Sequence, residues 1–114
     1  MKSKITSLSK NIEFKSILSG RKLSNKYSTI FFKKLAGKNK KKLNISFVTK
    51  KKIGNAVERN KIKRKLRNIM NFIANEHEIN QDFSYLIIAK KIILDVNFAE
   101  LKKSFLFEFK KIGL

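Results

Sequence analysis

The segment from Lys51 to Ile73 reads KKIGNAVERNKIKRKLRNIMNFI, and the spacing of its apolar residues is that of an amphipathic helix. Gly54 interrupts the preceding pattern, and apolar residues then recur at i, i+4, i+7 and i+11. These residues are Ile62, Leu66, Ile69 and Ile73. The segment therefore predicts a helix that begins at Ala56, packs one narrow stripe against a core and frays between Asn75 and Asn80.

A short helix and two strands are predicted before this central helix. The helix runs from Asn11, its expected N-cap, to Gly20. Residues 27–35 (YSTIFFKKL) form a strand rich in aromatic and β-branched residues, with apolar groups on both faces. A basic turn at 36–42 leads to a second strand at 43–49, in which apolar and polar residues alternate. We expect the two strands to pair as an antiparallel hairpin.

A strand and a helix are predicted after the central helix. Residues 83–89 (FSYLIIA) are almost continuously apolar, which is typical of a central strand covered on both sides. The last helix runs from Asn97 to Ile112, and Asn97 and Glu100 have the spacing of a capping box. Its expected apolar stripe consists of Phe98, Leu101, Phe105, Phe109 and Ile112. The elements alternate without an internal repeat, so residues 1–114 are interpreted as one domain.

The composition points to a polyanionic partner. The chain of 114 residues contains 28 basic and 8 acidic residues, which gives a formal net charge of +20. A small protein with this charge repels itself unless an anionic partner neutralises it. The chain has no cysteine, which excludes disulfides and zinc–cysteine sites. No apolar run is long enough for a signal sequence or a membrane span, so we expect a cytoplasmic protein with no membrane partner.

The central helix concentrates the arginines on one side. Three of the chain's four arginines, Arg59, Arg64 and Arg67, lie within nine residues. At about 100° per residue, Asn60, Arg64, Arg67 and Asn71 share the face opposite the apolar stripe. The planar guanidinium group binds phosphate in a bidentate way that lysine does not reproduce. The candidate nucleic-acid contacts are Lys50, Lys51, Lys52, Asn55, Arg59, Asn60, Lys61, Lys63, Arg64 and Arg67.

Other side chains give weaker indications. The aromatic residues Phe14, Tyr27, Phe31 and Phe32 could stack on unpaired bases, although packing in the core is the more common role of such residues. The only histidine, His77, lies between Glu76 and Glu78 at an expected helix end, where solvated polar residues are common. No carboxylates show the paired spacing of a metal site or an acid–base pair. The sequence therefore predicts no catalytic residue and no metal ligand.

The segment from Lys51 to Arg67 resembles the signature of the protein component of bacterial ribonuclease P, in which a Gly-Asn-Ala-Val run and an Arg-Asn-Arg triplet open the central helix. Further motifs agree in order and spacing across nearly the whole chain. They are EF at Glu13 and Phe14, YLIIAK at 85–90 and FAELKKS at 98–104. The resemblance implies a holoenzyme that removes 5′ leaders from precursor tRNA, with a catalytic RNA subunit that carries out the magnesium chemistry.

The resemblance also implies roles for residues. Arg59, Asn60, Lys61, Lys63, Arg64 and Arg67 would contact the catalytic RNA, and a groove containing Phe14, Leu18, Thr29 and Phe31 would take the single-stranded leader. Two positions depart from the family pattern. Lys61 replaces the second arginine of the triplet and loses its bidentate fork. Leu18 replaces an aromatic residue that could stack on a base.

The resemblance further implies an α/β (α+β) two-layer sandwich, in which a small mixed sheet packs with three helices. One strand–helix–strand unit would have a left-handed crossover connection, whereas nearly all such units are right-handed. The expected partners are the catalytic RNA and precursor tRNA, with no stable protein partner, and Mg²⁺ would be held mainly by the RNA. The alternatives are a ribosomal or RNA-chaperone protein, a nuclease that acts without RNA through residues 76–78, and a peripheral membrane protein.

Overall fold

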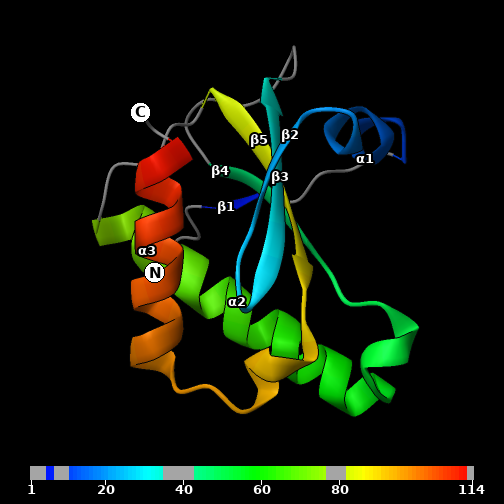
Figure 1. The fold of residues 1–114 in the computed structure, drawn as a ribbon, viewed down its shortest axis with the longest axis vertical. Helices are drawn as coiled ribbons and strands as arrows, with labels where there is room; N and C mark the ends of the chain where they lie inside the picture. The colour runs from blue at the N-terminus through cyan, green and yellow to red at the C-terminus, as the bar shows by residue number, and fades with distance from the viewer. Residues whose placement is uncertain (1–4, 7–10, 35–42, 77–81, 113–114) are drawn as a thin grey trace.

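The computed structural model describes residues 5–6, 11–34, 43–76 and 82–112 (Figure 1). The helices are α1 (Asn11–Leu18), α2 (Ala56–Glu76) and α3 (Phe98–Ile112), and two single-turn 3-10 helices are η1 (Lys51–Ile53) and η2 (Lys91–Leu94). The strands are β1 (Ile5–Thr6), β2 (Arg21–Ser24), β3 (Ser28–Lys34), β4 (Leu43–Val48) and β5 (Phe83–Ala89). The predicted helices and the strands at 27–35, 43–49 and 83–89 are confirmed within one or two residues. The predicted turn at 36–42 and the fraying after Glu76 lie outside the described residues.

The five described strands form one mixed sheet in the order β1-β4-β5-β3-β2. Strand β5 is central, antiparallel to β3 and parallel to β4. The predicted hairpin between β3 and β4 is therefore wrong, because β5 separates them. Strand β5 is buried along most of its length, so it needs a neighbour on each edge to satisfy its backbone groups. The sequence pattern identified the strands, but it did not specify their neighbours.

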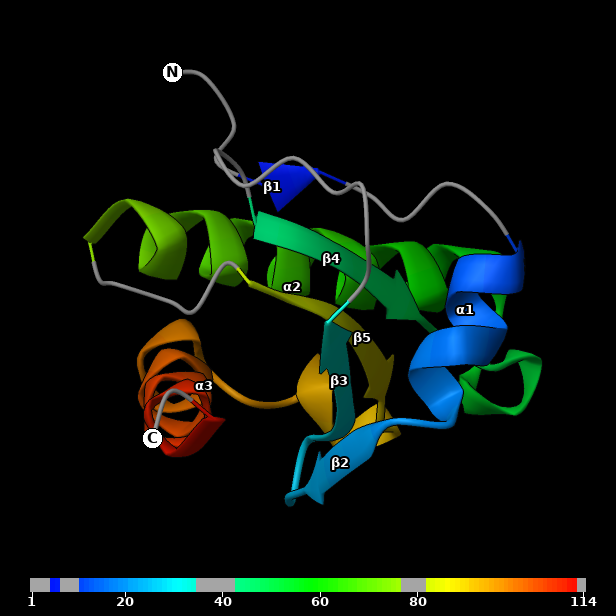
Figure 2. The same cartoon turned by 90° about the horizontal axis from the view of Figure 1, so that it is seen from above.

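Helix α2 connects the parallel neighbours β4 and β5. In Figure 2, β4 and β5 point the same way and α2 lies behind them, with β4 above β5. Seen from the helix side with the strands pointing up, β5 lies to the left of β4. The crossover is left-handed, as the resemblance implied. The mixed sheet with its three helices confirms the predicted α+β fold class.

The two faces of the sheet are covered differently. Helices α2 and α3 pack on the face that carries Ile30, Tyr85 and Ile87, and together they form the main core. The predicted stripe of α2 is confirmed, since Ile62, Leu66, Ile69 and Ile73 are all buried. The stripe of α3 is confirmed except at Phe98, which is 41% exposed and packs edge-on against Phe72 instead. Phe98 is the first residue of α3, one turn before the part of the helix that reaches the sheet.

Helix α1 covers only part of the opposite face. Ile17 of α1 packs on Leu86 of β5, and Phe14, Phe31 and Val48 surround this small cluster. The end of α1 at Leu18 agrees with the prediction, whereas the side chain of Asn11 lies outside what the structure describes, so its capping role stays a prediction. Helices α1 and α3 lie on opposite sides of the molecule in both views (Figures 1 and 2).

Candidate nucleic-acid interface

The outward face of α2 is an exposed basic surface. Asn60, Lys61, Arg64 and Arg67 are exposed, and Arg59, Lys63 and Asn71 are partly buried. The Nε of Arg59 is buried and has no hydrogen-bond partner among the described residues. A shallow cavity of about 300 Å³ lies beside Lys61, Arg64 and Asn68. The predicted placement of Arg64 and Arg67 on the side away from the core is confirmed, and their guanidinium groups can reach a phosphate backbone from outside.

The amino end of α2 is closed by a reciprocal capping box. The Oδ1 of Asn55 accepts a hydrogen bond from the amide of Glu58 at 2.9 Å, and the Oε1 of Glu58 accepts one from the amide of Asn55 at 3.1 Å. Asn55, predicted as a nucleic-acid contact, therefore has a structural role in the cap. The preceding lysines Lys50, Lys51 and Lys52 are exposed around η1. They add positive charge beside the helix amino terminus.

Lys65, on the flank of the basic face, points inward. Its Nζ donates hydrogen bonds to the backbone oxygens of Ile93 at 2.8 Å and Val96 at 2.5 Å. It also lies 3.5 Å from the backbone oxygen of Leu94. These bonds connect α2 to the end of η2. The ammonium group of Lys65 is therefore used in positioning this loop, and it is not available to a nucleic acid.

The sheet face that carries α1 forms a groove with two cross-strand rows. The first row is Ser46, Leu86 and Phe31, and Ile17 of α1 packs on it. The second row is Val48, Ile88 and Thr29, all of them only partly buried. Because alternate residues of a strand share a face, both rows lie on one surface beside α1. The groove floor is therefore aromatic and aliphatic, and it is open along the second row.

The second row opens into a cavity of about 400 Å³ with four lysines in its lining. These are Lys50 and Lys52, which follow β4, and Lys90 and Lys91, which follow β5. The Nζ of Lys90 also donates to the backbone oxygen of Asn25 at 2.6 Å. Clustered ammonium groups at one end of an apolar groove match a strand of nucleic acid, whose phosphates need cations and whose bases need apolar surface.

Sequence reasoning missed Lys90 and Lys91. Both follow the most apolar strand of the chain, and the carboxyl ends of parallel neighbours meet at one edge of a sheet. That signal is readable only once β4 and β5 are known to be parallel neighbours, and the predicted hairpin paired β4 with β3 instead.

The four residues predicted for the leader groove are only partly brought together. Phe14 and Phe31 pack on the same small cluster, and Thr29 lines the lysine cavity. The Thr29 hydroxyl is also 3.1 Å from that of Ser24 on the adjacent strand. Leu18 is 48% exposed at the end of α1 and lies outside this cluster. Two other predicted stacking candidates, Tyr27 and Phe32, are buried in the main core.

The acidic residues do not converge. No group of three or more histidine, cysteine or acidic residues among the described residues could hold a metal ion. Glu76 is exposed at the end of α2, and His77 and Glu78 lie outside the described residues. Burial, together with the nearby charge of Asp82, raises the pKa of the Tyr85 hydroxyl, which is at the centre of the core and away from the groove. The helices described here are too short or too polar to cross a membrane.

The fold and these two surfaces define a small basic α+β protein of the nucleic-acid-binding class. A model of the family "Ribonuclease P" matches residues 2–113. The ribonuclease P protein component of Bacillus pumilus is 36% identical over 105 residues, covering 91% of this chain and 85% of the relative. The chain therefore belongs to the ribonuclease P protein family, and it acts in tRNA processing as the protein component of an endoribonuclease that works with an RNA.

Solved structures agree with this assignment. The RNase P protein from Thermotoga maritima has a TM-score of 0.77 at 26% identity, with 93% of this chain and 96% of that chain covered. The RNase P protein of Staphylococcus aureus has a TM-score of 0.66 at 29% identity, with 94% of each chain covered. The resemblance stated from the sequence is confirmed at the level of family and fold.

Proposed function

We propose that the chain binds the catalytic RNA through the outward face of α2 and the 5′ leader of precursor tRNA through the groove beside α1. The proposal rests on one observation: the protein has two cationic surfaces of different character, an exposed helix face and an apolar groove. The α2 surface is helical and carries exposed Arg64 and Arg67, which suits the phosphates of a folded RNA. The groove combines apolar side chains with lysines, which suits an unpaired strand.

The apolar and the basic parts of the groove would bind different parts of the leader. Leader bases would lie on Phe14 and Phe31, and leader phosphates would contact Lys50, Lys52 and Lys91 at the cavity. Only precursor tRNA has a leader, so binding in the groove would favour the substrate over the mature product. Stacking on an aromatic side chain stabilises a bound base by about 1 to 3 kcal/mol.

Hydrolysis is assigned to the RNA subunit. We expect the Mg²⁺ ions of the holoenzyme to be held mainly by RNA, and the protein to raise substrate affinity by supplying positive charge near the RNA. The chain's lysines and arginines reduce the repulsion between two polyanions, the catalytic RNA and the precursor. We expect this assembly to act in the cytoplasm.

A matched pair of variants tests the two surfaces separately. Arg64→Ala combined with Arg67→Ala should weaken association with the catalytic RNA and lower the salt slope of log K by roughly 1.4 to 1.8, since each lost phosphate contact contributes about 0.7 to 0.9. Phe31→Leu keeps an apolar side chain on the cluster and removes the aromatic ring. It should leave RNA association unchanged and reduce the preference for leader-bearing over leaderless tRNA.

The measurement is filter binding of RNA and both tRNA forms across a salt series, with circular dichroism to confirm folding. An unchanged slope in the arginine variant would contradict the assignment of α2. Equal affinity of the unmodified holoenzyme for both tRNA forms would contradict the assignment of the groove, and it would favour a general RNA chaperone.

A further inference from the structure

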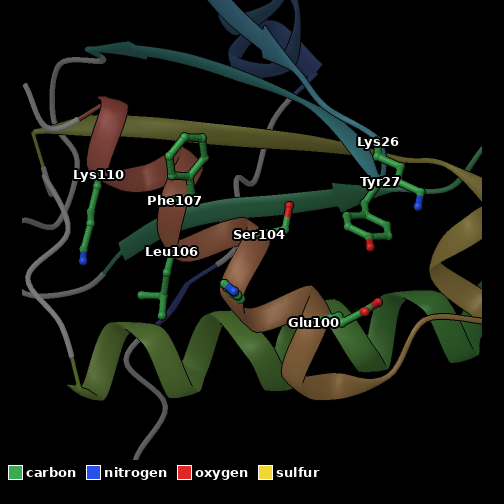
Figure 3. Close-up of a pocket in the computed structure, with 8 residues that line it drawn as sticks. Lys26, Tyr27, Glu100, Ser104, Leu106, Phe107 and Lys110 are labelled. Atoms are coloured by element: carbon green, nitrogen blue, oxygen red, sulfur yellow. The ribbon is translucent and has the colours of Figure 1, made fainter.

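We propose that a third cavity, between α3 and the turn that joins β2 to β3, binds an unpaired stretch of RNA independently of the groove and of α2. The pocket has a volume of about 640 Å³ and is lined by Lys26, Tyr27, Lys103, Leu106, Phe107 and Lys110, with Glu100 and Ser104 between them (Figure 3). None of these residues belongs to the surfaces described above. The inference does not depend on the function proposed for those surfaces.

Phe107 supplies a platform for a base. Its side chain is 60% exposed, more than that of any other phenylalanine in the chain. The ammonium group of Lys111 lies 4.4 Å from the centre of its ring. Lys111 lies over one face of the ring, so a base would stack on the opposite face. Aromatic stacking of this kind has little sequence preference, because every base has a π face.

The charges of the pocket favour an anion with hydrogen-bond donors. Lys26, Lys103 and Lys110 line it together with a single carboxylate, Glu100. The lysines match phosphates on either side of a stacked base. The carboxylate accepts hydrogen bonds, so it can receive one from an exocyclic amino group or a ribose hydroxyl. A second copy of the chain would bring a further formal charge of +20 to this surface, which opposes self-association.

The pocket and the groove lie on opposite faces of the sheet, and both border the turn between β2 and β3, where Lys90 of the groove cavity donates to the backbone oxygens of Tyr27 at 2.9 Å and Asn25 at 2.6 Å. The pocket is built on α3, whereas the groove lies beside α1, and these helices occupy opposite sides of the molecule (Figures 1 and 2). Tyr27, which lines the pocket, packs in the main core, whereas Thr29 lies on the other face of the sheet. A strand on the groove floor beside α1 would therefore leave the α3 side of the pocket, with Lys103 and Phe107, free for a different segment of RNA.

Site-specific photocrosslinking of the full chain tests the proposal. The photoreactive residue 4-benzoylphenylalanine replaces Phe107, and in a control protein it replaces Phe98, which is 41% exposed on the same helix but away from the pocket. The probe is a labelled single-stranded 12-nucleotide uridine oligomer, with an RNA duplex for comparison. We expect crosslinking of the single strand at position 107, little at position 98, and little of the duplex at either position.

A second change confirms that the pocket is responsible. Lys103→Ala should lower the crosslink yield at position 107 by about fivefold at 0.1 M salt, the effect of losing one single-strand phosphate contact. Lys102→Ala, at the next residue outside the pocket, should not. The yield should persist when Arg64 and Arg67 are both replaced by alanine, which separates this pocket from the α2 surface. Equal yields at positions 98 and 107, no RNA crosslink at 107, or a protein–protein crosslink there would overturn the proposal.

Discussion

Gly20 lies where the end of α1 passes close to the backbone of β3. A Cβ at this position would lie 2.8 Å from the backbone oxygen of Phe32 and 2.9 Å from the Cβ of Lys33. Neither contact involves the flexible end of a side chain. Glycine is therefore required at position 20, because the chain at the end of α1 passes close to the backbone of β3. This close packing holds α1 beside the groove.

Gly20→Ala should lower the free energy of unfolding by about 1 to 3 kcal/mol, because the backbone of α1 or β3 must shift to admit the methyl group. Thermal denaturation followed by circular dichroism measures the loss. Gly54→Ala is the comparison, since its added Cβ would meet the carboxylate of Glu58. That side chain can move at the cost of its capping hydrogen bond from the Asn55 amide, so we expect a smaller loss than for Gly20→Ala. An undisturbed melting temperature for Gly20→Ala would show that α1 is not held as described.

Single residues also show how much a sequence can predict. The capping spacing of Asn97 and Glu100 correctly marked the start of α3, where the Oδ1 of Asn97 accepts a hydrogen bond from the Glu100 amide at 2.8 Å. The structural use of Lys65 could not be predicted in this way. Its acceptors are backbone oxygens more than 25 residues away, and nothing in the local pattern distinguishes it from the solvated lysines beside it.

At the scale of elements, Lys65 connects α2 to the segment that links β5 to α3. In Lys65→Met the methionine side chain should pack where the aliphatic part of Lys65 packs, but the backbone oxygens of Ile93 and Val96 lose their donor. We expect the free energy of unfolding to fall by about 1 to 3 kcal/mol. Urea unfolding measures this. Lys61→Met, one turn earlier on an exposed position, should leave stability unchanged and weaken RNA binding instead. If both variants unfolded at the same urea concentration, the role given to Lys65 would be wrong.

The elements themselves were more predictable than their arrangement. Helix α2 and strand β5 followed from apolar spacing and from a continuous apolar run, which are local signals. Strands β1 and β2 were missed because the first has two residues and the second has one apolar residue, Leu23. The position of β5 between β3 and β4 depends on long-range pairing, so the lysine cavity at the ends of β4 and β5 could not be located without the structure.

At the scale of the whole molecule, the net charge of +20 is distributed over surfaces that lie on different sides of one small core. The sheet separates the groove from α2 and α3, and the left-handed crossover places the arginine face of α2 away from the groove floor. We therefore expect the protein to contact more than one segment of RNA at once. The family assignment explains why such a protein contains so much positive charge.

We propose that this chain assists an RNA that carries out hydrolysis, and reconstitution of the two components is the decisive experiment. Precursor tRNA is incubated at low magnesium concentration with the purified chain, with the cognate ribonuclease P RNA, and with both. We expect accurate removal of the leader only when chain and RNA are combined, because the positive charge of the chain replaces part of the magnesium that the RNA alone needs to bind its substrate. Removal of the leader by the chain alone, after all RNA has been digested and removed, would show that the protein carries out the hydrolysis and that the proposal is wrong.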